Sequence, residues 1–564
     1  MPALDLIRYL RQRPPGRLAA KAYRILREAG LAGLSWRLRL LRAQTQGYAR
    51  WLQAREAHAA AEGAALDAQI AALPAPPLIS VVMPVCDAPE PWLRRAIDSV
   101  RAQRYPLWQL CIADDASTAP HVRPLLEAAA AADSRIRLVF RESRGHICAA
   151  TRSALALAEG GFVAFLDHDD ELEPLALARV AAEIGRHPEA DLLYGDEDLV
   201  GTDGRRYDPY FKPDWNPELL RAQNYVCHLA VYRAALLSGL DAFRPEVQGS
   251  QDWDLALRAA ERAKGIRHIP HILYHWRSVP GSTAHSDTAK AYALEAGRRA
   301  VQDHLDRCGE AATAELLPFG HLRVRRTLPA PAPRVSLIVA APVLQLKALH
   351  DARCPEAEVL VADHDDALPL RLNRAAAGAH GDILCFVDGR CRATGAGWLE
   401  TLVAEALQAG VGAVGARLLD ARGRIRHAGY LLDAQAIVLH PWRGAPAAFA
   451  GIRNRALLQQ NVSAVSAGGL AVSRAAFEQA GGFDAAAGSF FDVDFCLRLL
   501  DAGLRNVWTP HATLVLAAPP EAEADAEAQE RMRDRWGERL ARDPAGNPNL
   551  VLDRGLAVAG TMRR

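Results

Sequence analysis

The sequence lacks any long apolar run. No stretch of its 564 residues approaches the roughly 18 consecutive apolar residues that a membrane-spanning helix needs. The amino terminus also lacks the short apolar segment of a secretory signal. We therefore expect a cytoplasmic protein that neither crosses a membrane nor is exported.

An excess of charge of one sign is missing as well. The 67 basic and 66 acidic side chains nearly cancel, which argues against a nucleic-acid partner, because such proteins draw affinity from a large positive field. The nine cysteines include no Cys-x-x-Cys pair and are odd in number. Neither a zinc site nor a disulfide framework is indicated, and a reducing compartment fits.

The composition indicates a folded protein of two large domains. Half of the residues are hydrophobic and 24% are charged, so there is ample material for cores. Two proline-rich breakers, "LPAPP" at 73–77 and "LPAPAPR" at 328–334, divide the chain. We predict a helical region over 1–73, a first domain over 78–327 and a second over 334–564.

The amino-terminal region is strongly basic. Residues 1–55 hold twelve basic side chains against two acidic ones, a local balance of +10, with apolar residues at helical spacing between the arginines. Such a helix can lie on an anionic membrane surface, or it can be a solvated face packed on the next domain. The sequence leaves both interpretations open.

The two large blocks begin alike. "LISVVMPV" from Leu78 and "RVSLIVAAPV" from Arg334 are short apolar runs that end at a proline, Pro84 in the first block. Each block then has a second run that ends in acid, "QLCIADDAS" and "EVLVADHDD", and a third, "GGFVAFLDHDD" and "GDILCFVDGR". Strands that alternate with helical segments predict a parallel α/β sheet whose site lies at the carboxyl ends of its strands.

Acidic residues cluster at these strand ends in the first block. Asp167, Asp169 and Asp170 directly follow an apolar strand, where three carboxylates are costly to bury without a cation. Mg²⁺ or Mn²⁺ would relieve that cost and would suit a diphosphate substrate. A lone Asp-x-Asp is equally typical of a polar loop or a helix cap.

Two further positions support a site. Asp114 and Asp115 end an earlier strand, where they suit hydrogen bonds to a base and a ribose, although alone they could form an ordinary turn. Asp252 lies at the head of an amphipathic helix, about 85 residues beyond Asp167, where it could also be an N-cap.

The motifs together resemble the family 2 glycosyltransferases, which have the GT-A fold. The resemblance covers most of 78–284 through "HICAATRSALALAEGGFVAFLDHDDEL", "RRYDPYFKPDWNPELLRAQNYVCHLAVYR", "GSQDWDLALR" and "RHIPHILYHWRSVPGSTA". These strings are similar to a tandem-domain subgroup associated with O-antigen and other surface polysaccharides.

The resemblance implies an inverting, metal-dependent sugar transfer in the first domain. It assigns Asp114 and Asp115 to the nucleoside, Asp167 and Asp169 to the ribose and the metal, and Asp252 to the general base. We expect a UDP-, dTDP- or GDP-linked sugar donor and a glycan acceptor, which could be lipid-linked at the cytoplasmic face of the inner membrane.

Five more residues complete the predicted site. We assign Pro84 and Asp87, beside the first strand, to the nucleotide-sugar site. In "YHWR", Arg277 could reach the diphosphate and His275 could be a metal ligand, although a histidine beside a tryptophan is as often a packed structural residue. Asp196 in "GDEDL" could contact sugar hydroxyls or lie in a solvated loop.

The second block resembles rhamnosyltransferase-like members of the same family. It does so through "GWLETLV", "NVSAVSAGGLAVSRAAFEQAGGFD" and "FFDVDFCLRLLDAG", in which Asp492 corresponds to Asp252. Asp114 and Asp167 are 53 residues apart, but Asp363 and Asp388 only 25, a difference of 28.

Arg390 stands where Asp169 would be aligned in this block. An arginine cannot bind a divalent ion, although it can clamp a diphosphate. The block is therefore either non-catalytic or metal-independent, and we expect a degenerate domain that positions the acceptor glycan or the first domain.

Two other classes remain open from the sequence. A sugar-1-phosphate nucleotidyltransferase would need a glycine-rich loop after its first strand, and the only similar string, "GAVGARL", lies deep in the second block. A non-catalytic glycan-binding or scaffold protein fits the second block better than the first. A transferase with both domains active is the third alternative.

Overall fold

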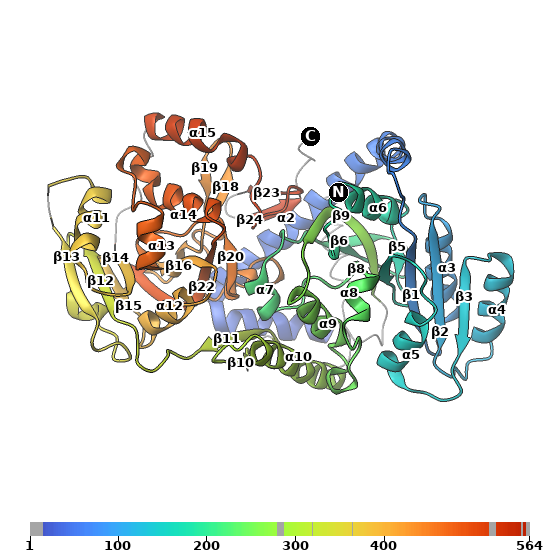
Figure 1. Ribbon diagram of the computed structural model, residues 1–564. Coiled ribbons are helices and arrows are strands. Elements are labelled where there is room, and N and C mark those ends of the chain that lie inside the picture. Colours follow the sequence, from blue (N-terminus) through green and yellow to red (C-terminus); the bar gives the residue numbers. More distant parts are fainter. Residues whose placement is uncertain are drawn as a thin grey trace.

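The protein consists of a long amino-terminal helix and two sheet-bearing α/β domains (Figure 1). The computed structural model describes residues 15–278, 287–318, 320–363, 365–517, 526–553 and 556–559. The predicted fold class, two tandem α/β domains of GT-A type behind a helical segment, is confirmed.

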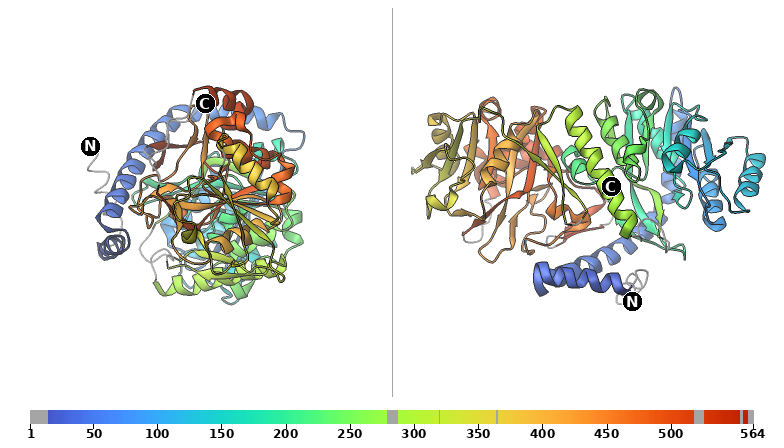
Figure 2. Two further views of the ribbon diagram at one scale, coloured as in Figure 1. Left: turned by 90° about the vertical axis from the view of Figure 1, so that its left-hand side faces the viewer. Right: turned by 90° about the horizontal axis from the view of Figure 1, so that it is seen from below.

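Helix α2 (Pro15–Ala71) lies along one side of both domains (Figure 2). It is interrupted at Gly30, whose φ of 62° is one that glycine adopts without steric cost. Trp51 packs on Phe211 of the first domain, and Trp36 packs on Phe449 of the second. This basic region therefore packs on both domains. No helix in the described part of the chain is long and apolar enough to cross a membrane.

The first domain alternates strands and helices, as its apolar runs predict. Its elements are β1 (Ile79–Val85), α3 (Glu90–Arg101), β2 (Trp108–Asp114), α4 (Val122–Ala132), β3 (Ile136–Phe140), α5 (His146–Leu155), β4 (Phe162–Phe165), β5 (Glu171–Leu172), α6 (Ala176–Arg186), β6 (Leu192–Val200), β7 (Arg206–Tyr210), α7 (Pro217–Ala222), β8 (Ala230–Arg233), α8 (Ala234–Ser238), η1 (Pro245–Val247), α9 (Gln251–Ala260), β9 (Ile266–Arg277) and α10 (Asp287–Arg307).

Its sheet has the order β3-β2-β1-β4-β8-β6-β9-β5, with β7 beside β6. Strands β3, β2, β1 and β4 are parallel, whereas β8 runs antiparallel to both β4 and β6. The start of β8 therefore lies at the edge where β1, β2 and β4 end. This edge gathers residues that are far apart in the sequence.

The second domain follows the hairpin of β10 (Ala312–Leu316) and β11 (Leu322–Arg326). Its elements are β12 (Val335–Ala340), η3 (Leu346–Leu349), β13 (Glu358–Ala362), α11 (Leu368–Gly378), β14 (Ile383–Asp388), β15 (Cys391–Ala393), α12 (Trp398–Ala406), β16 (Val411–Leu419), β17 (Ile425–His427), β18 (Leu431–Asp433), β19 (Ile437–Leu439), η4 (Ile452–Leu457), β20 (Gln460–Val462), β21 (Gly469–Ser473), α13 (Arg474–Gln479), η5 (Ala485–Phe490), α14 (Phe491–Asp501), β22 (Arg505–Leu516), α15 (Ala526–Leu540), β23 (Leu550–Asp553) and β24 (Leu556–Ala559).

The second sheet repeats the first without its outer edge. Its order, β13-β12-β14-β21-β16-β22-β15, matches β2-β1-β4-β8-β6-β9-β5 strand for strand. The described part of this domain has one helix, α11, between β13 and β14, where the first domain has α4, β3 and α5. The 28 residues that the sequence comparison finds missing thus correspond to a helix and an edge strand.

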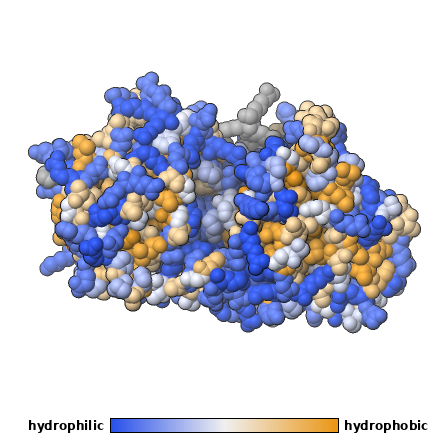
Figure 3. All heavy atoms as spheres, viewed as in Figure 1, coloured by the Kyte–Doolittle hydropathy of each residue, from blue (hydrophilic) through white to orange (hydrophobic). Residues whose placement is uncertain are grey.

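Buried ionic groups join the domains. Arg326 of β11 is 6% exposed, and its guanidinium lies 2.5 Å from Glu405 Oε2 in α12 and 3.5 Å from Glu218 Oε2 in α7. Beside it, Asn216 and Asn461 exchange hydrogen bonds of 3.0 and 2.8 Å. On the surface, a hydrophilic band crosses this junction over α10 (Figure 3). The junction is therefore held by specific polar pairs.

Replacing Arg326 with methionine should destabilise the whole chain. The change keeps the bulk but leaves the buried carboxylate of Glu405 without its cation, whereas Glu218 keeps Arg221 at 3.2 Å. Breaking a buried pair in this way typically costs about 3–5 kcal/mol. Urea denaturation followed by circular dichroism measures the loss. Arg325→Met is the matched control, because Arg325 is exposed on the same strand and pairs with Glu315 only at 3.7 Å. Equal midpoints for the two variants would contradict the proposed role of Arg326.

Candidate functional site

The candidate site lies at the carboxyl edge of the first sheet. Asp114 is the last residue of β2, and Asp167 follows the end of β4 by two residues. Because β8 is antiparallel to β4, the residues just before it, including His228, lie at the same edge. The topology thus brings together residues from three separate segments.

One end of the site holds Asp114 and Asp115, which are 4% and 2% exposed. Asp115 Oδ1 accepts hydrogen bonds from Arg141 Nε at 2.8 Å and from Gly145 N at 2.9 Å. Asp114 Oδ2 accepts from Ser117 N at 3.2 Å, whereas its Oδ1 is buried without a partner among the described residues. A buried carboxylate oxygen left open in this way points to a hydrogen-bond donor on a ligand.

Asp87 ties the loop after β1 to the loop after β2. Its Oδ1 accepts from Thr118 N at 2.7 Å and from Ala119 N at 2.9 Å, and Arg144 pairs with its other oxygen. The backbone hydrogen bonds, first that from Ala119, hold the pKa of Asp87 below its usual value. Pro84, predicted beside it, is in β1 opposite Ala113. Both residues lie at the end of β1, beside the loop that follows Asp114 and Asp115.

Asp170 holds the loop that follows β4. It is 1% exposed, and its carboxylate accepts from Tyr274 Oη at 2.5 Å and from Arg277 N at 2.6 Å. Burial, followed by the charges of Asp167 and Asp169, raises its pKa well above the usual value. Asp170 therefore fixes the loop, and the less buried Asp167 and Asp169 remain as the better candidates for contact with a ligand.

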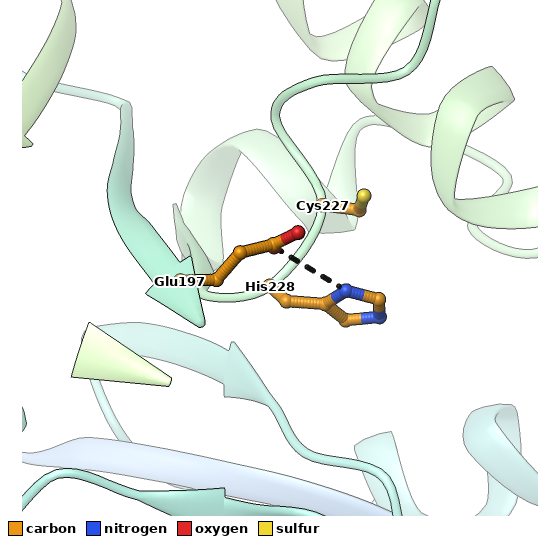
Figure 4. Close-up of side chains that lie close together, drawn as sticks. All are labelled: Glu197, Cys227 and His228. Atoms are coloured by element: carbon orange, nitrogen blue, oxygen red, sulfur yellow. Dashed lines mark ion pairs between the residues drawn. The ribbon is translucent and has the colours of Figure 1, made fainter. Parts of the chain in front are cut away.

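His228 belongs to the site although the sequence analysis does not single it out. Its Nε2 lies 3.8 Å from Asp167 Oδ2, its Nδ1 lies 3.5 Å from Glu197 Oε2 (Figure 4), and its ring stacks on Tyr274. Candidate ligand atoms of Asp167, Asp170 and His228 all lie within 4.8 Å of one another. Carboxylate oxygens with one imidazole are a donor set that suits Mn²⁺ and similar divalent ions.

Lys212 fixes the segment that carries His228. The side chain is fully buried, and its ammonium group donates to the carbonyl oxygens of Cys227 at 2.6 Å and His228 at 2.7 Å. The same group lies 3.3 Å from Glu197 Oε2. A buried cation thus balances a buried carboxylate and sets the backbone next to the imidazole.

Asp252 lies in the first turn of α9. Ser250 occupies the N-cap position of the helix, so Asp252 is not its N-cap. Asp252 Oδ2 instead accepts from Asn224 Nδ2 at 2.8 Å. Burial is the main cause of the raised pKa of Asp167, and the charge of Asp252 adds to it. The charge of Asp252 therefore acts on Asp167.

Two predicted site residues lie on the other face of the sheet. His275 pairs with Asp198 across β9 and β6, at 2.6 Å from Nδ1 to Oδ1, whereas its neighbour Tyr274 faces His228. Side chains alternate between the two faces of a strand, so His275 and Asp196 point away from Asp167. Asp196 lies in a buried strand, not in a solvated loop, and accepts from His268 and Asn547.

Arg277 is also used differently from the prediction. It is 1% exposed, its Nε donates to Asp169 O at 2.8 Å, and its Nη2 pairs with Glu171. Its guanidinium stacks 4.3 Å from the centre of the Trp92 ring. It therefore positions the acidic loop rather than presenting its charge to a diphosphate.

The second-domain candidates also meet at a sheet edge. Asp388 ends β14 and Asp492 lies in the first turn of α14, and both line one cavity together with Arg390. Arg390 forms a two-pronged pair with Asp388, with Nε–Oδ1 at 2.9 Å and Nη2–Oδ2 at 2.6 Å. Both oxygens of Asp388 are thereby occupied by a guanidinium, which closes this position to a divalent ion.

Comparison with known proteins identifies the family of the first domain. The family "Glycosyl transferase family 2" matches residues 80–240. Residues 80–240 therefore belong to this family, which confirms the resemblance. The match covers Asp114, Asp167 and His228 but ends before Asp252.

Two curated relatives match most of the chain. The "Uncharacterized protein y4gI" of Sinorhizobium fredii is 39% identical over 539 residues, or 86% of this chain and 59% of that protein. The "O-antigen biosynthesis protein RfbC" of Myxococcus xanthus is 35% identical over 551 residues, or 90% of this chain and 42% of that protein. The chain thus spans about half the length of these relatives.

Solved structures resemble the chain only over part of its length. Staphylococcus aureus TarS 1–349 in complex with UDP-GlcNAc aligns at 22% identity over 40% of this chain and 66% of that chain, with a TM-score of 0.34.

Proposed function

We propose that the chain is an inverting glycosyltransferase that moves a sugar from a nucleoside-diphosphate donor to a glycan acceptor, with its catalytic site in the first domain. The observation that carries the proposal is that Asp114 ends β2 and Asp167 follows β4 at one edge of the sheet, within the residues that match family 2. Beyond that match, the charge of Asp252 in α9 acts on Asp167. Asp114 has a buried oxygen without a partner among the described residues, Asp167 lies beside His228, and Asp252 accepts a hydrogen bond from Asn224. Each carboxylate can therefore take a different role.

The donor nucleoside is proposed to lie against the loop after β2. Asp114 Oδ1 is a buried acceptor without a partner in the described structure, so it would accept an N–H of the base. Asp115 keeps the loop in place through Arg141. UDP-, dTDP- and GDP-linked sugars all present such a donor on their base.

The sugar diphosphate would lie next to Asp167, Asp169 and His228. Ligand atoms of Asp167, Asp170 and His228 lie within 4.8 Å of one another and fit Mn²⁺ or Mg²⁺, and a bound ion would supply positive charge to the departing diphosphate. On this proposal His228 replaces His275 as the imidazole ligand. Tyr274, Arg277 and Lys212 hold the surrounding loops in place.

Asp252 is proposed to be the general base. Inversion needs one group to take the proton of the acceptor hydroxyl as its oxygen attacks the anomeric carbon opposite the leaving diphosphate. Asn224 donates to one oxygen of Asp252, which orients the carboxylate. A second carboxylate acting as nucleophile, as in retaining glycosidases, is not required.

The second domain is proposed to be degenerate and to hold acceptor glycan. Arg390 pairs with both carboxylate oxygens of Asp388. The described part of the sheet has no counterpart of β3, the edge strand that would lie beside a nucleoside. The name of the Myxococcus relative favours a role in O-antigen-like surface polysaccharide synthesis. Work at the cytoplasmic face of the inner membrane, on a lipid-linked acceptor, fits that role.

The outer part of α2 is proposed to contact that membrane. Leu31 and Leu38 are 79% and 44% exposed there, among the exposed side chains of Arg39 and Arg42. Exposed leucines between arginines suit the surface of an anionic bilayer. Trp36 and Leu40 of the same stretch pack on the second domain, so only the opposite face of this part of α2 is available.

Asp252→Asn should abolish transfer while donor binding persists. The amide keeps the shape and the contact with Asn224 but cannot accept a proton, and loss of a positioned base costs about 10²–10⁴ in rate. Turnover of a nucleotide-sugar panel and calorimetric binding of UDP measure the two effects. Asp241→Asn, at an exposed position, is the control. Full activity of Asp252→Asn would remove this residue from the reaction.

Asp167→Ala should weaken Mn²⁺ binding by at least about tenfold, because it removes a direct oxygen ligand. Electron paramagnetic resonance of free Mn²⁺ gives the affinity, and transfer in excess EDTA gives the dependence on metal. Asp98→Ala, an exposed residue of α3, should bind Mn²⁺ normally. Undiminished wild-type transfer in EDTA would contradict the metal assignment.

Neutralising the exposed arginines of α2 should reduce binding to anionic vesicles. Each basic residue near such a surface contributes on the order of 1 kcal/mol, and salt screens the attraction. We expect at least about 100-fold weaker binding when glutamine replaces Arg24, Arg27, Arg39 and Arg42. Removing the whole helix would be a poor test, because Trp51 and Arg55 are buried in the first domain.

The matched control replaces four exposed arginines at the far end of the first domain, namely Arg94, Arg101, Arg123 and Arg137. It removes the same charge and should leave vesicle binding within about threefold of the wild type. Equal losses in the two variants would show that net charge, not α2, governs the interaction.

A further inference from the structure

The two ring nitrogens of His228 face different carboxylates. Nε2 lies 3.8 Å from Asp167 Oδ2, in the loop after β4, and Nδ1 lies 3.5 Å from Glu197 Oε2, in β6 (Figure 4). The first nitrogen is therefore directed at the proposed metal position. The second is directed away from it, at a strand in the interior of the sheet.

The contact between His228 Nδ1 and Glu197 is buried. Glu197 is 4% exposed, and its Oε2 and His228 Nδ1 are both buried atoms without a hydrogen-bond partner among the described residues. Most buried polar atoms in proteins are hydrogen-bonded, because each one that is left unpaired costs stability. A movement of a few tenths of an ångström would bring these two atoms to hydrogen-bond distance. Glu197 is therefore an acceptor within reach of Nδ1.

Glu197 is better suited to hold the imidazole than to bind an ion itself. Ligand atoms of Glu197, Cys227 and His228 do lie within 4.8 Å of one another, as they would at a metal site. However, Lys212 Nζ lies 3.3 Å from Glu197 Oε2, and the Cys227 thiol donates to Asn224 O at 3.5 Å. A fixed ammonium group beside the carboxylate repels a second cation. The role left for Glu197 is that of a hydrogen-bond acceptor.

The imidazole ring is confined by its other neighbours. It stacks on Tyr274 with ring centres 4.9 Å apart, and its centre lies 5.2 Å from that of the Trp276 ring. Lys212 holds the backbone of His228, whose φ of 50° is uncommon outside glycine. A half-turn of the ring would put carbon atoms where Nδ1 and Nε2 now lie. A hydrogen bond to Glu197 selects the orientation that directs Nε2 at the metal position.

We propose that Glu197 is a positioning residue, whose carboxylate accepts the Nδ1–H of His228 and so directs Nε2 at Asp167, the other proposed ligand of the divalent ion. The inference rests on the proposed function, in which His228 is a metal ligand. Loss of such a partner of a metal-bound histidine typically weakens metal binding about 10–100-fold. The other two acids of β6, Asp196 and Asp198, point to the opposite face of the strand and cannot take this role.

Binding of Mn²⁺ alone to the full chain tests the proposal. Electron paramagnetic resonance gives the affinity, and electron spin echo modulation by nitrogen shows whether an imidazole is bound to the ion. Glu197→Met keeps the bulk but removes the acceptor, so we expect about 10–100-fold weaker binding of Mn²⁺ and loss of the nitrogen modulation. His228→Ala should lose the same modulation, which assigns the signal to this residue.

Asp198→Asn is the matched control, because Asp198 is the next residue of β6, is fully buried and pairs with His275 on the other face. It should leave both readouts unchanged, whatever its effect on stability, which thermal melting reports. If Glu197→Met fails to fold, Glu197→Gln replaces it. An amide oxygen accepts a hydrogen bond more weakly than a carboxylate, so Mn²⁺ should then bind about tenfold more weakly, with reduced nitrogen modulation.

Wild-type affinity and nitrogen modulation in the Glu197 variant would overturn the proposal and leave the ligand role of His228 intact. An equal loss in Asp198→Asn would also overturn it, because the effect would then follow from destabilisation of β6. Absence of nitrogen modulation in the wild-type protein would show that His228 is not a ligand. In that case the inference falls together with this part of the proposed function.

Discussion

Three buried carboxylates in a row on β6 organise the first domain. Asp196 and Asp198 are fully buried on the face toward α2 and the carboxyl-terminal segment, where Asn547 and Tyr48 reach them. Glu197, between them, faces the site and pairs with Lys212. Without a partner, each buried carboxylate would destabilise the fold by several kcal/mol. Strand β6 therefore connects α2, through Tyr48, and the carboxyl-terminal segment, through Asn547, to the segment that carries His228. Burial opposes ionisation of Asp198, but His275 and Arg206 still hold its pKa below the usual value.

Over its described residues, the second domain keeps the central strands of the first domain but lacks its outer edge. Both sheets share seven strands in the same order. In its described part the second domain lacks a helix and the outer strand between β13 and β14, and it has the short turn η3 where the first domain has α3. The loss exposes β13, and Arg390 pairs with Asp388 where the first domain has its proposed metal site. Both changes fall on the side that we propose for the donor. The acceptor side, around α14, keeps its cavity, and this is why we assign the second domain to glycan and not to donor.

Much of the fold could be predicted from the sequence, because apolar runs that end in acid mark parallel strands and their carboxyl edge. The gap of 28 residues also corresponds to a helix and an edge strand of the first domain.

The functional site was harder to predict from the sequence. His275 and Asp196 were misplaced because one residue of register decides which face of a strand a side chain takes. His228 was missed because its place depends on β8 running antiparallel to β4, which local sequence does not reveal. The assignments of Asp114, Asp167, Asp169 and Asp252 stay predictions.

The central claim is that one of the two domains performs transfer. Linkage analysis of the products made by Asp252→Asn and Asp492→Asn tests it most directly, on a short soluble acceptor with the wild type alongside. Asp252→Asn should form no product, and Asp492→Asn should form the wild-type linkage at a nearly unchanged rate, because its carboxylate is held by Ala467 and Val493. Loss of one of two distinct linkages in Asp492→Asn would show instead that the second domain is a transferase in its own right.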